Sequence, residues 1–391
     1  MKHWKTYTER QKPAYIRDSI LPELNTDVVV VIPCFNEPDL FETLYNLHAI
    51  RRPGANVLIL VVFNSGEHSD ESAVLQNRLS YEQLLMFSEK MSEHGFHYFP
   101  LLFERLPRKH AGVGLARKIG MDLAVAHFLQ NGKPGGIIIS LDADCTVSDN
   151  FMVSVYEAFS DNERLNATVH NYFHRVEKND HPLENAVRQY EDYIRYFREM
   201  LKQTGFPYYY HTIGSAFAVT ADAYVRVGGM GRQQGGEDFY FLQKVFALGD
   251  VKELNDTVVY PMARFSDRIP FGTGPALKKI MDEPDGIMKV YSRRSFYELK
   301  RLFDMKDSFF GMDSEEVTAM ITELDSILVD FLRMTGFVDE VAECNRNSAS
   351  PTTFQKRFFH HFNAFRIIKY LNFVHPDPFN YEKLSIVADK F

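Results

Sequence analysis

The chain has 391 residues, with 44 Lys and Arg against 52 Asp and Glu and a formal net charge of −8. Its hydrophobic fraction of 45% and charged fraction of 25% are typical of a globular protein, and they exclude collagen-like, intrinsically disordered and disulfide-scaffold chains. The acidic balance gives the chain no overall attraction for nucleic acid, so we expect no nucleic-acid partner.

The three cysteines are far apart and lack CxxC or CxxH spacing, which favours a reducing compartment over a disulfide framework or a zinc site. Residues 1–12 are polar and lack the apolar segment of a signal peptide. The longest apolar runs are far shorter than the ~20 residues of a membrane span. We therefore expect a cytoplasmic protein.

The first part of the chain predicts a doubly wound α/β sheet, because short apolar runs alternate with longer helical patterns. The predicted strands are Val28–Pro33, Val57–Phe63, His97–Phe103 and Gly136–Leu141, and the predicted helices between them are Asp39–Ile50, Ser72–Ser92 and Gly114–Leu129. The continuous β-branched runs suit strands that are covered on both faces. Ligands of such sheets bind beyond the carboxyl ends of the strands, so the residues after each strand are the candidates for function.

The pattern changes after residue 150. A strand is predicted near Ala167–Phe173 and a long helix near Leu183–Lys202, and the chain is mostly helical after residue 282. Asp313, with Glu316 three residues later, predicts a capping box at the start of a helix. That helix is expected to carry the apolar residues Val317, Ile321, Leu324, Leu328 and Phe331.

A last helix is predicted to carry an apolar stripe formed by Phe354, Phe358, Phe362, Phe365 and Ile368. We interpret this stripe as core packing between C-terminal helices. The opposite face carries the basic residues Lys356, Arg357, Arg366 and Lys369. Contact of this helix with a membrane surface is therefore the alternative.

Polar residues follow the predicted strands at the edge where ligands bind. Pro33, Asn36 and Glu37 come at the end of the first strand, and Asn64 begins a polar turn after the second. A strand stop and a helix cap explain these residues as well as contact with a nucleotide does. A basic cluster from Arg108 leads into two glycines and a helix start, which would suit phosphate groups, although a solvated loop is the commoner explanation.

Two carboxylates, Asp142 and Asp144, directly follow the fourth strand. Carboxylates in this position are costly to desolvate unless they meet a cation or hydrogen-bond donors. Oxygen ligands of this kind suit Mg²⁺ or Mn²⁺ held together with substrate phosphates. The pair therefore predicts a metal site, with a structural turn as the alternative.

A glycine-rich segment between Gly228 and Gly236 leads into Glu237 and Asp238. This pattern predicts a mobile loop followed by an acidic helix start. The two carboxylates either complement the helix dipole or supply a general base when substrate orders the loop.

In their order and spacing over residues 27–250, these motifs resemble the family 2-like glycosyltransferases of the GT-A fold. The matching elements are V-x-I-P-x-F-N-E from Val30 to Glu37, A-R-K-I-G-M-D from Ala116 to Asp122, the strand end and D-A-D from Leu141 to Asp144, G-S-A-F from Gly214 to Phe217, and the glycine-rich loop to Asp238. The resemblance implies an α/β fold with a Rossmann-like, mostly parallel sheet flanked by helices and a C-terminal helical extension.

The same resemblance suggests a division into four segments. They are an N-terminal extension (1–26), a nucleotide-sugar-binding half (27–150), an acceptor-binding and catalytic half (151–281) and a helical C-terminal region (282–391).

The family implies an enzyme that moves a sugar from a nucleotide-diphosphate donor to an acceptor hydroxyl, with Mg²⁺ or Mn²⁺ as cofactor. On this analogy the nucleotide side of the site consists of Pro33, Asn36, Glu37, Asn64, Arg117 and Asp142. Asp144, with Asp142, would bind the metal ion that bridges the donor diphosphate. Asp238 falls on the position of the base in inverting members, and Glu237 would orient the acceptor.

Two departures keep alternatives open. Asn64 stands where the family usually has an aspartate, so the nucleotide base is not specified. No histidine follows the acidic pair between Tyr260 and Arg268, where some relatives place a metal ligand, although Asp267 could substitute. This region resembles relatives that glycosylate small phosphorylated acceptors with retention. A retaining enzyme and a non-catalytic nucleotide-binding protein of the same fold are the alternatives.

A sugar-1-phosphate nucleotidyltransferase ranks lower, because the segment after the first strand lacks the glycine-rich loop that those enzymes use. The acceptor is open and includes a saccharide, a small phosphorylated molecule and a lipid-linked glycan. A lipid-linked acceptor would bring the protein to the inner membrane face through its C-terminal helix.

Two further segments are candidates for contact with substrate. Arg264–Pro275 is predicted as a lid, with Arg264 and Arg268 reaching the diphosphate or an anionic acceptor. An aromatic wall that stacks on a sugar is predicted from Tyr208, Tyr209, Tyr210 and His211, although a core cluster is the commoner outcome for such residues.

Overall fold

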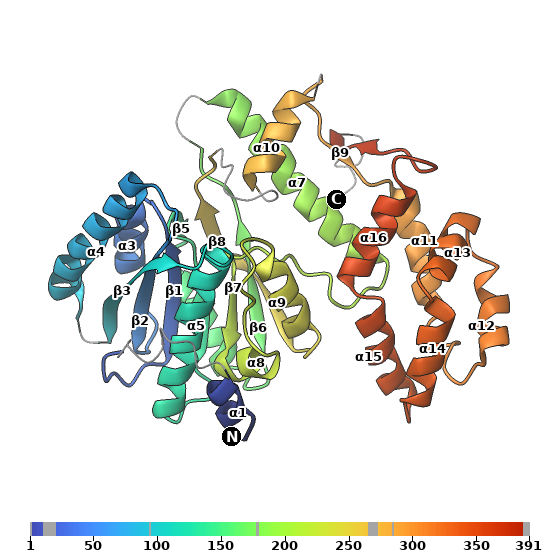
Figure 1. The fold of residues 1–391 in the computed structure, drawn as a ribbon, viewed down its shortest axis with the longest axis horizontal. Helices are drawn as coiled ribbons and strands as arrows, with labels where there is room; N and C mark the ends of the chain where they lie inside the picture. Colours follow the sequence, from blue (N-terminus) through green and yellow to red (C-terminus); the bar gives the residue numbers. More distant parts are fainter. Residues whose placement is uncertain are drawn as a thin grey trace. The chain divides into compact units, whose positions relative to one another are not determined.

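The computed structural model describes residues 2–10, 21–93, 95–176, 180–264, 273–283 and 285–385. The chain divides into two compact units, each built from two separate stretches of sequence. The first unit comprises residues 1–180 and 212–275, and the second comprises residues 181–211 and 276–391. The first unit holds a sheet with helices on both of its faces, and the second is mainly helical (Figure 1).

The first unit is built on an eight-stranded sheet in the order β3-β2-β1-β4-β7-β6-β8-β5. Its strands are β1 (Val28–Cys34), β2 (Val57–Gly66), β3 (Phe96–Leu106), β4 (Ile137–Ser140), β5 (Cys145–Val147), β6 (Ala167–Tyr172), β7 (Phe217–Thr220) and β8 (Val251–Pro261). Within this sheet β7 and β5 run antiparallel to their neighbours, and the remaining pairings are parallel. The predicted α/β class with a mostly parallel sheet is therefore confirmed.

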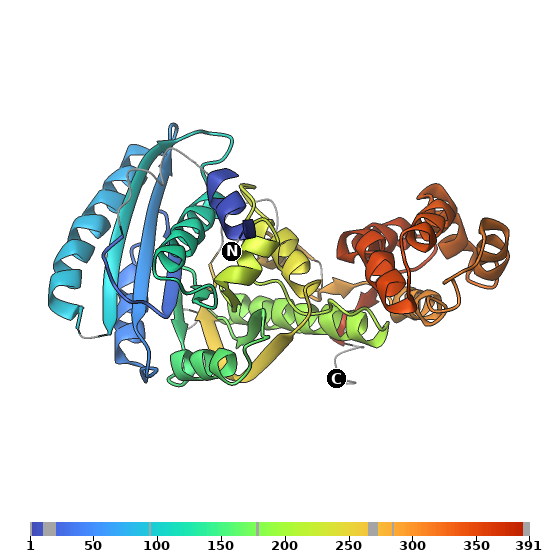
Figure 2. The ribbon, with the colours of Figure 1, turned by 90° about the horizontal axis from the view of Figure 1, so that it is seen from below.

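Helices cover both faces of the sheet. They are α1 (Lys2–Arg10), α3 (Leu40–Ala49), α4 (Glu71–Met91), α5 (Val113–Gln130), α6 (Phe151–Ser160), α8 (Ala221–Arg226) and α9 (Glu237–Phe246). The side chains of Val30 and Ile32 belong to the core cluster with α3 and α4. The neighbouring Val31 faces α5, where a Cβ added at Gly120 would lie 2.4 Å from its Cγ1. Successive strand residues thus point to opposite faces, with α4 in blue and α5 in teal on the two sides of the strands in Figure 2.

Complete burial explains why the central strands are continuous apolar runs. All seven residues of β1 are buried, and so is nearly all of β2. Each fully buried Val or Ile contributes roughly 1.5–3 kcal/mol to folding. The pattern that predicted these strands is therefore the same property that holds the sheet together.

The predicted strand stop at Pro33 is found on one side of the first strand only. On the side of β2, Pro33 does not stop the strand, because β1 continues through Cys34 and remains in register with β2 to the pair Cys34↔Phe63. The ladder to β4, on the other side, ends at the pair Val31↔Ser140. The backbone N–H of Leu141 still donates to the Val31 carbonyl, but Pro33 has no N–H to continue the ladder on that side.

Strand order places a switch point between β1 and β4. The chain runs from β1 outward to β2 and β3 and then returns through α5 to β4, on the other side of β1. In open α/β sheets the crevice at the carboxyl ends of two such strands binds the ligand.

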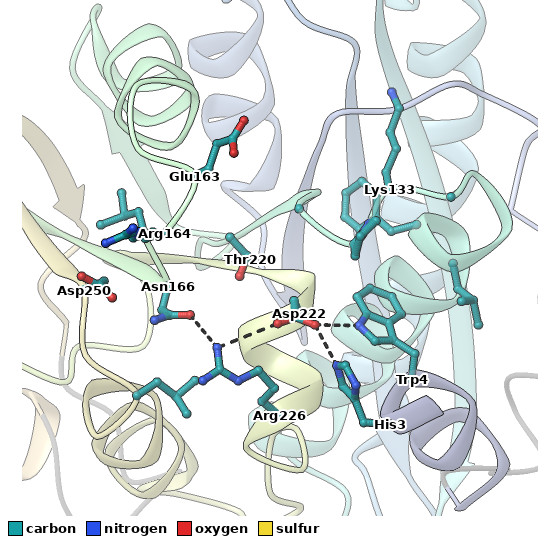
Figure 3. A pocket seen from close by; sticks show the side chains of 17 residues that line it. His3, Trp4, Lys133, Glu163, Arg164, Asn166, Thr220, Asp222, Arg226 and Asp250 are labelled. Carbon is teal, nitrogen blue, oxygen red and sulfur yellow. Dashed lines mark hydrogen bonds and ion pairs between the residues drawn. The ribbon is translucent and has the colours of Figure 1, made fainter. Parts of the chain in front are cut away.

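The polar N-terminal stretch forms a helix that its composition did not predict. The indole of Trp4 is 2% exposed and donates a hydrogen bond from Nε1 to Asp222 Oδ1 over 2.8 Å. His3 Nε2 lies 2.9 Å from the same oxygen. Figure 3 shows both side chains pointing from α1 to Asp222 on α8. One face of α1 is therefore exposed and polar, and the face that carries Trp4 and Tyr7 packs against the rest of the first unit.

The second unit is mainly helical. Its elements are α7 (His181–Gln203), α10 (Thr273–Asp282, which begins in the first unit), β9 (Lys289–Val290), α11 (Arg293–Asp304), α12 (Ser314–Ile321), α13 (Ser326–Met334), α14 (Phe337–Arg346), α15 (Pro351–His361), α16 (Ala364–Val374) and β10 (Glu382–Lys383). The predicted capping box is confirmed, since Asp313 accepts from the Glu316 backbone and Glu316 accepts from the Asp313 backbone. No helix among the described residues is long and apolar enough to cross a membrane.

Two helices that the periodicity predicted as continuous are each broken in two. α13 begins anew after α12, because the Asp325 side chain accepts a hydrogen bond from the Ile327 backbone. α16 begins anew after α15, because Asn363 accepts from the backbone N–H of Arg366. Apolar spacing continues across both breaks, so the capping side chains decide where the helices end.

The aromatic stripe lies in the core of the second unit. Phe354, Phe358 and Phe362 are at most 2% exposed, which confirms core packing for them, whereas Phe365 is 43% exposed. The predicted basic face is smaller than expected, because Arg366 is buried and forms an ion pair with Glu340. Contact of these helices with a membrane surface stays a prediction.

Candidate functional site

A cavity of about 450 Å³ opens at the carboxyl ends of β1, β2 and β4, at the switch point of the sheet. It is lined by Pro33, Cys34, Phe35, Glu37, Asn64, Ser65, Gly66, Ser69, Ala111, Gly112, Val113, Asp142, Ala143, Asp144 and Gln234. Three strand ends and the start of α5 thus supply its walls, as the pattern of residues after the strands predicted.

Asn77, on α4, holds the ends of the first two strands together. Its Oδ1 accepts a hydrogen bond from the Asn36 backbone over 2.8 Å, and its Nδ2 donates to the Asn64 carbonyl over 2.9 Å. Asn77 is 1% exposed, and Asn36 has a left-handed backbone with φ of 50°. Asn36 does not line the cavity, and its described contact is the backbone bond to Asn77. An asparagine inside a helical pattern gave no sequence signal for this role.

Arg264, which follows β8, forms ion pairs with acidic residues after β1 and β4. Arg264 Nη2 lies 2.7 Å from Glu37 Oε2 and 3.1 Å from Asp144 Oδ2. Burial raises the pKa of Asp144 to about 6, with Asp142 and Glu37 adding to the rise and Arg264 opposing it. Burial alone would lower the pKa of Arg264, but Glu37 and Asp144 keep it above its ordinary value. The neighbouring carboxylates of Glu37, Asp142 and Asp144 repel one another, so a positive charge beside Asp144 is stabilising.

Arg117 connects the acidic strand end to the acidic helix start. From α5, its guanidinium donates to Asp142 Oδ1 over 2.7 Å and also to Glu237 at the start of α9. The side chain is 3% exposed. Burial would lower the pKa of Arg117, but Asp142 and Glu237 hold it well above its ordinary value. Two motifs almost a hundred residues apart are thereby joined through one buried cation.

Asp238 lies beside this network. Burial and the charge of Glu237 raise its pKa to about 6, and Arg117 opposes part of that rise. The backbone N–H of Phe239 donates to Asp238 Oδ1 over 2.7 Å. A Cβ added at Gly214 would lie 2.9 Å from Asp238 Oδ2 and 3.0 Å from Arg117 Nη2, so the glycine gives both side-chain ends room. This explains the G-S-A-F motif as a site of close approach.

Glycines also bring α5 against the loop before α9. A Cβ added at Gly114 would lie 2.1 Å from the carbonyl oxygen of Gln233. The backbone of the loop therefore occupies the space that a side chain at position 114 would need. Gln234 Nε2 donates to the Arg108 carbonyl over 2.9 Å. The glycine-rich loop is thus fixed against the basic segment in front of α5.

The structure brings most of the predicted site residues together. Pro33, Glu37, Asn64, Asp142 and Asp144 line the cavity. Arg117, Glu237 and Asp238 do not line it but form the network behind Asp142. Asp267, Arg268 and most of the predicted lid lie outside the described residues. Tyr208, Tyr209, Tyr210 and His211 belong to the second unit, and Tyr209 and Tyr210 stack with ring centroids 4.6 Å apart.

A metal ion would find only part of its ligands preformed. Among the described residues no group of three His, Cys, Asp or Glu is arranged to hold one. The oxygens available are the carboxylates of Asp142 and Asp144, with Glu37 close by. One or two carboxylates with water and substrate phosphates are a common set for Mg²⁺. The donor set fits a cation that arrives with an anionic substrate.

A second cavity, of about 530 Å³, lies at the opposite edge of the sheet, among the residues that precede β4, β6 and β8 (Figure 3). Its principal charges have partners. Lys133 Nζ lies 2.6 Å from Asp27 Oδ1, and Asp222 is bonded to α1. Arg226 donates to Asn166 Oδ1 over 3.3 Å. This cavity is larger than the first but contains no crowded carboxylates.

Neither a protein-family model nor a curated protein sequence matches the chain. Among solved structures it is similar to S. aureus TarS 1-349, with 12% identity and a TM-score of 0.41 over 87% of this chain and 91% of that chain. It is also similar to the mannosyltransferase PcManGT from Pyrobaculum calidifontis in complex with GDP-Man and Mn²⁺, with 15% identity and a TM-score of 0.39 over 92% of this chain and 95% of that chain.

Proposed function

We propose that the protein is a glycosyltransferase that uses a nucleotide-diphosphate sugar as donor. The observation that carries this proposal is the buried link from Asp142 through Arg117 to Glu237, beside the cavity at the switch point. It combines a crowded carboxylate pair, suited to a cation and a diphosphate, with a second carboxylate, Asp238, whose raised pKa suits proton transfer.

The cavity suits a nucleotide diphosphate in size and polarity. Its volume lies within the usual range for small-molecule sites, about 300–1,000 Å³. Asn64 offers a side-chain amide to a base, as a donor and an acceptor. The start of α5 carries no side-chain cap at Gly112, so its first backbone N–H groups and its dipole favour an anion. The diphosphate would lie between this helix start and Asp144.

Asp144 and Asp142 are the residues that would hold Mg²⁺ or Mn²⁺. When bound, the ion would act as a Lewis acid and stabilise the charge on the leaving nucleotide diphosphate. In the described structure the Arg264 guanidinium lies against Asp144 and Glu37. Loading of the site therefore requires Arg264 to move away from Asp144, and its charge then becomes available to the diphosphate.

Asp238 is proposed as the base. A carboxylate with a pKa of about 6 is ionised at neutral pH and still basic enough to accept a proton from a hydroxyl in the transition state. The acceptor oxygen would attack the anomeric carbon as its proton passes to Asp238, and the bond from that carbon to the diphosphate would break. Glu237 would orient the acceptor only through the Arg117 network, because its side chain is 2% exposed. Direct attack of this kind gives inversion.

Binding is the first test. We expect Mn²⁺ with one of the nucleoside diphosphates UDP, GDP, ADP, CDP or dTDP to raise the melting temperature of the full chain. Asp144→Ala should abolish the Mn²⁺-dependent part of this rise. The matched control is Asp161→Asn, because Asp161 is exposed at the end of α6.

Turnover is the second test. We expect release of the nucleoside diphosphate from its sugar conjugate in the presence of acceptor candidates, and loss of that release in Asp238→Asn. NMR of the product would report the anomeric configuration and so separate inversion from retention. A nucleotide that binds without any Mn²⁺ dependence, and equally well to Asp144→Ala, would contradict the metal assignment.

A further inference from the structure

A third cavity, of about 420 Å³, lies behind the basic segment in front of α5. It is lined by Lys109, His110, Lys118, Met230, Gly231, Arg232 and Gln233. Its described lining contains four basic residues and neither Asp nor Glu. By contrast, the cavity in Figure 3 has mixed charges that are mostly paired and so carries no ligand proposal.

The deepest of these basic groups is Lys118, which is 4% exposed. Its ammonium lies 2.9 Å from Asp122 Oδ2, yet no atom of the described structure accepts a hydrogen bond from it in good geometry. The other oxygen, Asp122 Oδ1, already accepts from the hydroxyls of Tyr7 and Tyr224, each over 2.7 Å. Asp122 therefore balances the charge of Lys118 but can accept from at most one of its three N–H donors.

A buried ammonium with unfilled donors is costly unless a further acceptor completes it. Lys118 has three N–H donors, and it lines the cavity. An oxygen-rich anion in the cavity would supply the missing acceptors.

The outer basic groups point to the same ligand. Lys109 and Arg232 are exposed and come from two different segments, and neither has an ion-pair partner within the part of the chain that the structure describes. Gln234, which bonds to the Arg108 carbonyl, keeps these two segments side by side. Like charges held together without a carboxylate between them repel one another, and a bound anion relieves that repulsion.

We propose that this basic cavity, formed by Lys109, His110, Lys118 and Arg232, binds the phosphoryl group of a small molecule. It adjoins the cavity at the switch point, which we call the donor cavity, without being part of it. His110 and Gln233 line the basic cavity, and the next residues along the chain, Ala111 and Gln234, line the donor cavity. Its ligand is either inorganic phosphate or a phosphorylated metabolite. The proposal does not depend on the transferase activity.

Calorimetric titration of the full chain with inorganic phosphate tests it, at pH 7.5 and constant ionic strength. We expect saturable binding that becomes about tenfold weaker or more in Lys109→Gln/Arg232→Gln, because charge-assisted hydrogen bonds to two cations are lost. Both substituted residues are exposed, so the fold should survive. The control Lys90→Gln/Lys252→Gln makes the same charge change at exposed positions elsewhere and should bind phosphate within twofold of the unaltered chain.

A second titration series contains Mn²⁺ and the nucleoside diphosphate that binds best, to fill the donor cavity. Phosphate should still bind when the donor cavity is filled in this way. Absence of nucleotide binding would count against the transferase proposal alone. The basic cavity is refuted if phosphate does not bind the unaltered chain, or if both double variants bind it equally.

Glucose 6-phosphate and glucose distinguish the sources of the phosphoryl group. Tighter binding of glucose 6-phosphate than of inorganic phosphate, with no binding of glucose, identifies a phosphorylated metabolite. Equal binding of the two phosphates identifies the free anion, and both outcomes support the site. Binding of glucose as tight as that of its phosphate overturns it.

Discussion

Arg117 shows how a single side chain defines the architecture of the site. Its guanidinium is buried, and two carboxylates from distant segments compensate for the lost hydration. Removal of one member of such a buried ion pair typically costs about 3–5 kcal/mol, so the group is retained or lost as a unit. Asp238 takes no part in these ion pairs, but the charges of Glu237 and Arg117 act on it. A buried carboxylate with a raised pKa in such a position is a candidate general base.

Asp144 should reduce the stability of the free protein. Its pKa is raised from 3.8 to about 6, so the folded state binds more protons than the unfolded state between these values and stability falls as pH rises through that window. We predict that Asp144→Asn increases the free energy of unfolding by about 1–3 kcal/mol at pH 7.5. Arg264 keeps Glu37 as its partner in this variant. Urea unfolding measures the change.

The pH dependence of the stability gain in Asp144→Asn provides a control. The gain should shrink at pH 5, because Asp144 is then largely protonated in the folded protein. Asp161→Asn, at an exposed position, should change stability by less than about 0.5 kcal/mol at either pH. A gain that is independent of pH, or a loss at pH 7.5, would contradict this account of Asp144.

Asp238 should determine the acidic limb of the pH–rate profile. Because its pKa is about 6 and only the ionised form accepts a proton, kcat/KM should fall about tenfold for each pH unit well below 6. Asp238→Asn should lower kcat by about 10²–10⁴-fold and remove this limb. Saturating Mn²⁺ suppresses the contribution of Asp144, whose pKa is similar. An unchanged acidic limb in Asp238→Asn would assign the titration to another group.

At the level of elements, the contact between α5 and the loop before α9 positions Arg117. Gly114 lies one turn before Arg117 on α5, and its Cα faces the Gln233 carbonyl. A side chain there would push apart the two elements that Arg117 joins.

Gly114→Ala should therefore impair the site more than the fold. An added Cβ would lie 2.1 Å from a backbone oxygen, which cannot rotate away as a side chain can. We expect a loss of about 1–3 kcal/mol in stability and a fall in kcat/KM of about tenfold or more. Gly54→Ala is the matched control, since no atom lies within 4 Å of its added Cβ. Equal activity of the two variants would show that the contact does not position the network.

The elements also show what sequence alone can predict. The strands and helices from Val28 to Leu141 were predictable, because burial makes β1, β2 and β4 apolar runs and β3 is buried over part of its length. The short strands β5 and β7 were not, since neither has a run like the three consecutive isoleucines that mark the equally short β4. α1 was missed because its buried aromatic residues are outnumbered by polar ones.

The candidate site was predictable at the strand ends but not in its internal contacts. Asp142 and Asp144 follow a recognisable strand, and topology brings them to Glu37. The ion pair of Arg264 with Glu37 joins residues 227 positions apart, and the Asn77 bridge depends on a buried position inside a helix. Such contacts arise from tertiary packing, which leaves no periodic signal in the sequence.

At the level of the whole molecule, the two units have separate cores. Every residue that lines the donor cavity belongs to the first unit. The second unit is held by an aromatic cluster in which the Phe358 ring lies within 6.3 Å of the rings of Phe303, Phe309, Phe337 and Phe362. A defect in this cluster should therefore affect stability and donor binding differently.

Phe358→Ala tests this separation. Phe358 is 2% exposed, and its truncation leaves a cavity among aromatic rings, so we expect the unfolding transition of the second unit to lose about 3–5 kcal/mol. The affinity of the folded variant for a nucleoside diphosphate with Mn²⁺, measured well below that transition, should stay within twofold of the unaltered chain. Phe365→Ala, at a position 43% exposed, should change neither property appreciably. A tenfold weaker affinity in folded Phe358→Ala would mean that donor binding extends beyond the first unit.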